Sequence, residues 1–232
     1  MSHDQKTFLL WVAIPYVSFT IFWVGHAWRY RAGQYTWTTR SSELLEQKLL
    51  RPGIILFHVA MALVLFGHGL GLLVPQSFTD SLGISERIYH YNAVVVGSLA
   101  GFTMAIGLAL LVFRRAANER VRRVTLVRDW IVMATLIVVV ITGLGNLVVN
   151  QWAGDGYNYR ETVSPWVRSI IMFRPDPELM NEAPLTFQIH AMAAMVLFAI
   201  WPFTRLVHAW SAPISYLRRP YLVFRRRDSL AR

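Results

Sequence analysis

The sequence contains no cysteine among its 232 residues. This absence excludes disulfides, iron–sulfur clusters held by thiolates, and covalent c-type haem attached through a C-x-x-C-H motif. Charged residues are also scarce, at 16% of the chain against about 25% in an ordinary soluble domain. Obvious repeats and low-complexity segments are absent as well. Any redox cofactor in this chain must therefore be held by other ligands, and histidine is the obvious candidate.

Hydrophobic residues make up 55% of the chain and gather in five long segments. A transmembrane helix needs roughly 20 apolar residues to cross about 30 Å of hydrocarbon. The first segment lacks a basic n-region and an A-x-A-like cleavage site, so it predicts a retained helix rather than a signal peptide. The sequence predicts an all-α integral membrane protein in which residues 1–232 form a single domain. Its five helices are expected at residues 8–28, 53–75, 90–113, 130–149 and 185–208.

Basic residues are distributed unevenly around these segments, and they give the chain a net charge of +10. Residues 29–51 carry five Lys and Arg, residues 114–128 carry six and residues 205–232 carry seven. All three stretches lie on one side of the membrane if the five segments span it. The positive-inside rule then predicts an N-terminus outside and a cytoplasmic C-terminus, with 209–232 as a basic cytoplasmic tail. Such clusters serve topology, anionic lipid or a cytoplasmic partner, so the charge does not indicate nucleic acid.

Six of the seven histidines fall in predicted membrane helices; His26 and His90 lie near helix ends, and the other four divide evenly between two helices. His58 and His68 belong to the second segment, whereas His190 and His208 belong to the fifth. Because these helices run antiparallel, we expect His68 to lie level with His190 near the outer face. His58 is then expected level with His208 near the cytoplasm. Ionisable residues inside membrane helices are rare and usually functional, although any single one could form a plain interhelical hydrogen bond.

The two expected pairs predict two bis-imidazole sites at two depths. Zinc normally takes four ligands, whereas a planar haem takes two axial ligands and an apolar slot. Glycines near the histidines leave room for a flat ring, although small residues also let helices pack closely. These are Gly67, Gly69, Gly71, Gly97, Gly101 and Gly107. Without a C-x-x-C-H motif the haem is non-covalent, and the sequence predicts a five-helix bundle with two b haems whose irons are ligated by the four histidines.

The spacing of the histidines differs between the two helices. At a rise of about 1.5 Å per residue, the separation is roughly 15 Å in the second segment and roughly 27 Å in the fifth. Tilted macrocycles, crossed helices or a kink at Pro202 would each absorb the difference. The sequence leaves these alternatives open.

Several motifs are distinctive when taken together: "WRYRAGQYTWTTRSS" after the first segment, "LFH" followed ten residues later by "GHG" in the second, "FQIH" and "WPFTRLVHAWSAP" at the two ends of the fifth, and "YLRRPYLVFRRR" in the tail. With these motifs the chain resembles, over nearly its full length, the gamma subunit of respiratory nitrate reductase. That subunit is a di-haem cytochrome b of the prokaryotic cell (inner) membrane. The family's four haem ligands fall on His58, His68, His190 and His208.

The resemblance implies that quinol is oxidised near an outer haem held by His68 and His190, with protons released outside. Electrons would then cross to an inner haem held by His58 and His208. They would continue at the cytoplasmic face to an iron–sulfur beta subunit and a molybdenum-cofactor alpha subunit, where nitrate is reduced. Two alternatives stay open: a haem b subunit of another quinone-linked complex, such as a sulfur-metabolising one, and a cofactor-free structural membrane anchor.

The quinol site departs from the family's pattern, because better-known members carry a lysine where "LGISERIYHYN" has none. Arg87 or His90 is expected to hold the quinol oxygen, with Gly67 lining the site. A neutral histidine accepts a proton near neutral pH, whereas arginine only donates hydrogen bonds. Both residues also suit an interfacial or capping role. Variants such as "WTTRSS" favour menaquinol as the substrate.

Arg205 stands one turn before His208 and is a candidate partner for a propionate of the inner haem, since buried anions need partners. Arg29 and Arg31, at the end of the first segment, are further candidates. All three also suit an ordinary position at the inner membrane boundary.

Overall fold

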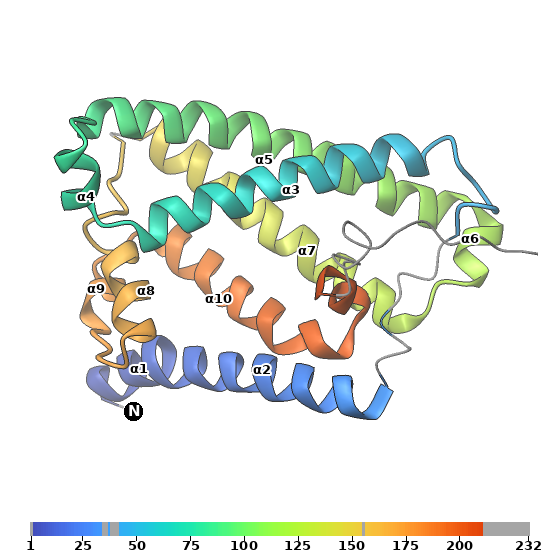
Figure 1. Cartoon of the computed structure of the whole chain (residues 1–232), viewed down its shortest axis with the longest axis horizontal. Coiled ribbons are helices and arrows are strands. Elements are labelled where there is room, and N and C mark those ends of the chain that lie inside the picture. The colour runs from blue at the N-terminus through green and yellow to red at the C-terminus, as the bar shows by residue number, and fades with distance from the viewer. Residues whose placement is uncertain (1, 34–36, 38–41, 155, 211–232) are drawn as a thin grey trace, which may run out of the picture.

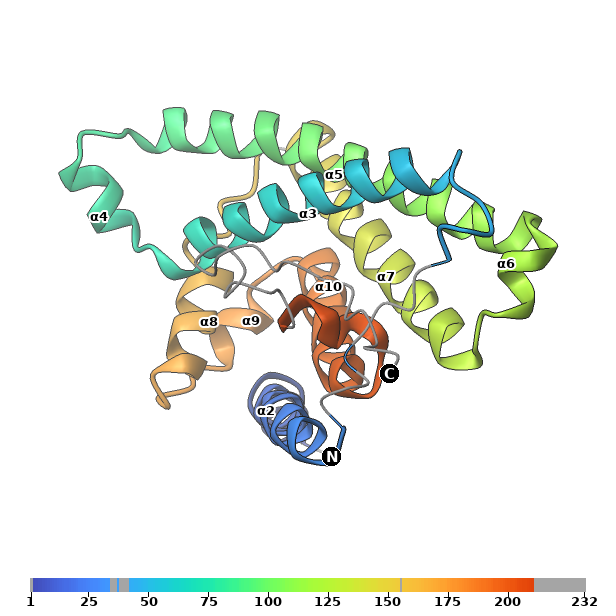
Figure 2. The same cartoon turned by 45° about the vertical axis from the view of Figure 1, so that its right-hand side comes forward.

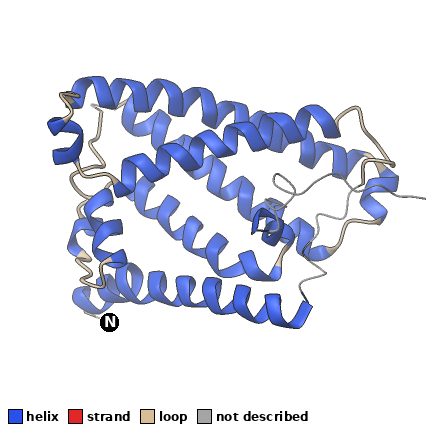
Figure 3. Ribbon diagram, viewed as in Figure 1, coloured by secondary structure: helices blue, strands red, loops and turns tan. Residues whose placement is uncertain are grey.

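The computed structural model describes residues 2–33, 37, 42–154 and 156–210. Every regular element in this part of the chain is helical, and five helices are long and apolar enough to cross a membrane. They cover His3–Gly33, Leu50–Leu73, Glu86–Ala117, Val127–Trp152 and Leu185–Phe203. The prediction of an all-α protein with five membrane-spanning helices is confirmed (Figure 3).

The five spans are joined by short helical connections. The first span consists of α1 (His3–Phe8), a π-helical turn η1 (Leu9–Ala13) and α2 (Ile14–Gly33). The other spans are α3 (Leu50–Leu73), α5 (Glu86–Ala117), α7 (Val127–Asn146) with the π-helical turn η3 (Leu147–Trp152), and α10 (Leu185–Ile200). The connections contain α4 (Gln76–Ser81), α6 (Glu119–Arg123), α8 (Val163–Ile171) and α9 (Glu178–Asn181). Figure 1 shows α4, α8 and α9 at one end of the bundle, the α8 end, and α6 at the opposite end, the α6 end.

The spans form two packed groups. α3 packs along α5, while α10 packs along both α7 and α2, and α5 also contacts α7. In Figures 1 and 2, α3 and α5 lie side by side on one side of the bundle, α2 lies on the other, and α7 and α10 cross between them. In the described part of the chain, α3 and α10 make their extensive contacts with other helices rather than with each other. Side chains that extend from α3 and α10 therefore meet between two packed groups.

Gly107 of α5 allows α3 to approach closely. A Cβ atom added at Gly107 would lie 2.5 Å from the backbone nitrogen of Phe57 on α3. Small residues at such contacts favour the association of membrane helices. Gly107 therefore serves close helix packing and does not leave room for a ring. Cβ atoms added at Gly67, Gly69 and Gly97 would meet no described heavy atom within 4 Å. Cβ atoms added at Gly71 and Gly101 would instead lie 2.5 Å from the hydroxyl of Tyr159 and 3.0 Å from Cδ2 of Leu144, so room for a flat ring stays a prediction at Gly67, Gly69 and Gly97 alone.

We expect Gly107→Ala to lower the free energy of unfolding by about 1–3 kcal/mol, because the backbone of a neighbouring helix cannot move aside as a side chain can. Thermal unfolding in detergent, followed by circular dichroism, measures the effect. Gly145→Ala in α7 is the matched control, since its new Cβ would meet no described atom within 4 Å. The control should melt at or slightly above the wild-type temperature, because alanine favours helix over glycine. Equal melting temperatures for the two variants would contradict the close approach.

The fifth segment, expected at residues 185–208, is interrupted at the proline that the sequence marked as a possible kink. α10 ends at Ile200, and a 3₁₀ turn η4 (Trp201–Phe203) follows it. Thr204 then adopts an extended conformation, with φ −118° and ψ −177°, before a 3₁₀ helix η5 (Arg205–Trp210) begins. Pro202 explains the break, because proline lacks the N–H that a helix needs and its ring clashes with the preceding turn. His208 therefore lies in η5 and does not share a helix face with His190.

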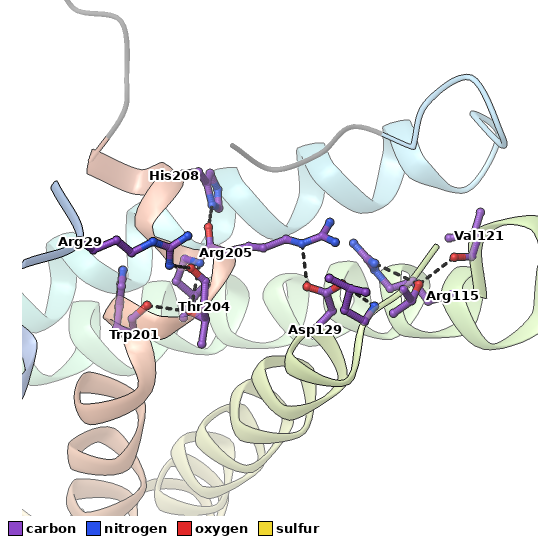
Figure 4. Close-up of polar contacts among 11 residues, drawn as sticks. Arg29, Arg115, Val121, Asp129, Trp201, Thr204, Arg205 and His208 are labelled. Atoms are coloured by element: carbon purple, nitrogen blue, oxygen red, sulfur yellow. Dashed lines mark hydrogen bonds and ion pairs between the residues drawn. The ribbon is translucent and has the colours of Figure 1, made fainter. Parts of the chain in front are cut away.

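Side chains of α2 hold this break in place. One guanidinium nitrogen of Arg29, Nη1, donates to the carbonyl of Pro202 at 2.6 Å and to that of Thr204 at 2.7 Å. Figure 4 shows Arg29 extending to Thr204 across the end of the helix. The ring of Phe22 also packs edge-on against Trp201, with centroids 5.8 Å apart. These contacts fix the direction in which the chain leaves α10.

Candidate functional site

The structure brings the four membrane histidines together in the two pairs expected from the sequence. The ring centroids of His58 and His208 are 6.2 Å apart, and those of His68 and His190 are 6.1 Å apart. One member of each pair belongs to α3, and its partner belongs to α10 or η5. The break after Ile200 accounts for the unequal spacings along the sequence, because the chain that carries His208 leaves the axis of α10.

The Nδ1 atoms of these imidazoles are engaged by the protein. Three of the four rings donate from Nδ1 to a backbone carbonyl three or four residues earlier in the chain: His58 to Ile54 at 2.9 Å, His68 to Val64 at 2.8 Å and His208 to Arg205 at 2.6 Å. A carbonyl can only accept, so the proton of each neutral ring is on Nδ1. The lone pair of each neutral ring then lies on Nε2, the nitrogen that would bind a metal.

The proton of the neutral His190 ring is also on Nδ1, but its acceptor is a side chain. Its Nδ1 lies 3.0 Å from Oγ1 of Thr142 on the neighbouring helix α7. The hydroxyl of Thr142 donates its own proton to the carbonyl of Val138 at 2.8 Å. The threonine oxygen is thus an acceptor for His190, and Nε2 of this ring also keeps its lone pair.

The distance within each pair fits one metal ion held between two Nε2 atoms. A metal–imidazole bond is about 2.0–2.1 Å long, and ring bonds near about 1.35 Å place each nitrogen about 1.1 Å from its ring centre. These lengths put the two ring centres about 6.3 Å apart, close to the 6.1 and 6.2 Å in the structure. No group of three or more His, Asp or Glu suited to a metal ion occurs among the described residues. Each pair would suit a haem iron, which takes two ligands from the protein.

Arg205 connects the segment carrying His208 to α7. Its Nε atom lies 2.7 Å from Oδ1 of Asp129, and the side chains are only 16% and 4% exposed. The second carboxylate oxygen of Asp129 accepts from the backbone N–H of Leu126 at 2.9 Å, at the first turn of α7. Figure 4 shows Arg205 extending from beside His208 to Asp129. Contact of Arg205 with a haem propionate stays a prediction, and Asp129 is the partner that the structure adds.

The residues predicted for the quinol site lie on α3 and α5, toward the α8 end. Gly67 precedes His68 and faces open space. Nε2 of the half-buried His90 would lie 3.5 Å from a Cβ added at Gly156, which places this histidine beside the loop after α7. Arg87 is exposed. No hydrogen bond joins any two of the three predicted residues in the described part of the chain, and their contact with quinol stays a prediction.

Residues 7–227 match the nitrate reductase gamma subunit family. The chain belongs to this family. Its members are membrane cytochrome b subunits of respiratory nitrate reductases, and the resemblance seen in the sequence motifs is confirmed.

Three relatives show how far the similarity extends. The chain is 42% identical to the nitrate reductase gamma chain of Bacillus subtilis over 220 residues, which cover 95% of this chain and 98% of that one. It is 35% identical to the respiratory nitrate reductase 2 gamma chain of Escherichia coli over 215 residues, covering 92% and 94%. It is 48% identical to the nitrate reductase-like protein NarX of Mycobacterium tuberculosis over 228 residues, covering 98% of this chain and 35% of that one. The chain therefore spans about a third of the length of the mycobacterial relative.

A buried polar cluster at the α8 end was missed by the sequence analysis. Arg160, only 5% exposed, donates to Oε2 of Glu86 at 2.8 Å and to Oγ1 of Thr79 at 2.9 Å. Its guanidinium carbon also lies 3.9 Å from the ring centroid of Tyr89. Burial and the hydrogen bond with Tyr89 raise the pKa of Tyr159 above its usual range. The cluster ties the loop after α7 to the first turn of α5, where the predicted quinol residues Arg87 and His90 begin the helix.

Proposed function

We propose that this chain is a di-haem cytochrome b that oxidises quinol near the outer membrane face and passes electrons to the catalytic subunits of a respiratory nitrate reductase. The observation that carries the proposal is the two imidazole pairs, whose ring centroids lie 6.2 and 6.1 Å apart and whose Nδ1 atoms are each engaged by a protein oxygen. Bound haem b would supply a one-electron carrier at each pair. His58 and His208 would hold one haem, and His68 and His190 the other.

The distribution of charge supports an orientation in the cell membrane. Arginines gather around α6 and the adjoining ends of α5 and α7: Arg114, Arg115, Arg120, Arg122, Arg123 and Arg128. The positive-inside rule favours a cytoplasmic location for this α6 end and an outer location for the α8 end. His208 lies toward the α6 end, beside Arg205 and Asp129 (Figure 4). The His58–His208 pair is accordingly the inner one, and the His68–His190 pair is the outer one.

At the outer pair, the chain binds quinol and receives its protons. Oxidation of one quinol to quinone releases two electrons and two protons, and the protons leave on the outer side. His90 is the residue we propose as proton acceptor, because a neutral imidazole can take up a proton near neutral pH. Arg87 would donate a hydrogen bond to the quinol oxygen, and the open face of Gly67 would admit the ring. Menaquinol is the favoured substrate.

At the α6 end, the chain would contact an iron–sulfur beta subunit, and through it a molybdenum-cofactor alpha subunit. The sequence has no cysteine, so iron–sulfur clusters in this electron path need another subunit as their host.

A reduced-minus-oxidised visible spectrum of the purified membrane protein tests the proposal. We expect b-type bands that resolve into two components with different midpoint potentials during a redox titration. A folded protein without these bands would contradict the proposal and support a cofactor-free structural membrane anchor. Copurification of a cysteine-rich iron–sulfur protein and a large molybdenum protein would support nitrate reductase over another quinone-linked complex.

A further inference from the structure

The ring of His190 is oriented by a neighbouring helix, unlike the rings of the other three paired histidines. His58, His68 and His208 each donate from Nδ1 to a carbonyl of their own segment. The Nδ1 of His190 instead contacts the hydroxyl of Thr142, 48 residues away in the sequence. The direction of this imidazole therefore depends on how α7 and α10 pack together.

The hydroxyl of Thr142 is itself held in one orientation. Its proton is directed at the carbonyl of Val138 at 2.8 Å, and its oxygen also lies 3.1 Å from the carbonyl of Val139. With its proton engaged by backbone, the oxygen presents a lone pair to His190. The threonine oxygen and the backbone carbonyl of Val139, which also contacts His190, together favour the tautomer in which Nε2 is unprotonated.

The next residue on α7 sets the position of the same ring. A Cβ added at Gly143 would lie 3.1 Å from Cε1 and 3.5 Å from Nδ1 of His190. The first distance is closer than ordinary van der Waals contact, so a larger residue would push the imidazole away from α7. Thr142 holds the ring by a hydrogen bond, and Gly143 allows the ring to lie close to α7.

We infer that Thr142 and Gly143 are positioning residues for His190, and that α7 thereby sets the affinity and midpoint potential of the outer haem. This inference rests on the proposed function. Hydrogen bonds to the second nitrogen of a metal-bound histidine fix its orientation and raise its basicity, and their loss typically weakens metal binding about 10–100-fold. A less basic imidazole stabilises ferric iron less, so loss of the bond should raise the potential of the haem at His190.

Thr142→Val tests the hydrogen bond, because valine keeps the shape of threonine and removes only the hydroxyl. We expect about 10–100-fold weaker retention of the outer haem, with a higher midpoint potential for the fraction retained and an unchanged inner haem. Thr142→Ser keeps the hydroxyl and should behave as the wild type. Thr135→Val is the matched control, since Thr135 lies on the same helix and its hydroxyl donates to the carbonyl of Ile131 at 2.9 Å.

Gly143→Ala tests the close approach of His190 to α7 independently and should also perturb the outer haem alone.

A wild-type protein without haem would contradict the proposed function. A wild type with two haems and an unchanged Thr142→Val variant would overturn only the present inference. Loss of both haems in Thr142→Val, while Thr135→Val keeps both, would show a general role in folding and would overturn it too. A Thr142→Ser variant as impaired as the valine variant would have the same consequence.

Discussion

Replacing either histidine of one pair by alanine should remove one haem and leave the other. His68→Ala and His190→Ala are expected to abolish the same spectral component, and His58→Ala and His208→Ala the other. Each substitution removes one of two imidazole rings whose centroids lie 6.1 or 6.2 Å apart. Because the two haems would act in series along the proposed electron path, all four variants should lose nitrate-dependent quinol oxidation completely.

A redox titration of the four variants, with quinol oxidation measured alongside, distinguishes this pairing from others. His3→Ala is the control, since His3 lies at the exposed start of α1 and has no histidine facing it among the described residues. It should keep both haem components and full activity. If His58→Ala and His68→Ala eliminated one and the same component, the assignment of ligands to two haems would be wrong.

Asp129→Ala is expected to lower the free energy of unfolding by about 3–5 kcal/mol, the usual cost of removing one partner from a buried ion pair. The substitution takes the buried carboxylate away from Arg205 and from the first turn of α7. Since the carbonyl of Arg205 accepts the Nδ1 proton of His208 at 2.6 Å, the inner haem should be lost preferentially. Thermal unfolding and the spectrum of the inner component measure the two effects.

Two further variants separate the roles of this carboxylate. Asp129→Asn keeps an oxygen for the N–H of Leu126 and removes only the charge, so it should be less damaging than the alanine variant. Glu119→Ala is the matched control at the same end, because Glu119 pairs with Arg123 while both side chains are largely exposed, at 62% and 76%. Such surface pairs contribute about 0–1 kcal/mol. If the Asp129 and Glu119 variants melted alike, the Arg205 pair would have no structural role.

The pairing of the histidines could be predicted from the sequence because it depends on quantities that are the same in every helix. The rise per residue and the antiparallel order of the second and fifth segments put His68 level with His190 and His58 level with His208. The end of α10 was only partly predictable. Pro202 was visible as a possible kink, but the choice among a kink, crossed helices and tilted macrocycles needed the observed end at Ile200.

The side chains that support the site could not be found in the same way. Thr142 is 48 residues from His190, and Arg160 is 74 residues from Glu86. Such contacts depend on which faces of two helices meet, and helices that are apolar on all sides carry little periodic signal about their facing side. The role of Arg205 shows the same limit, because a basic residue near His208 suggests an anionic partner without identifying Asp129.

The proline break after α10 has a consequence for the speed of electron transfer. A straight helix would carry His190 and His208 roughly 27 Å apart, whereas the ten residues between His58 and His68 span roughly 15 Å of α3. By ending α10 at Ile200 and directing η5 toward α3, the chain adopts the shorter spacing for both pairs. Electron tunnelling slows exponentially with distance, so along the proposed path Pro202, which would bind no electron carrier, would help to set the rate of turnover.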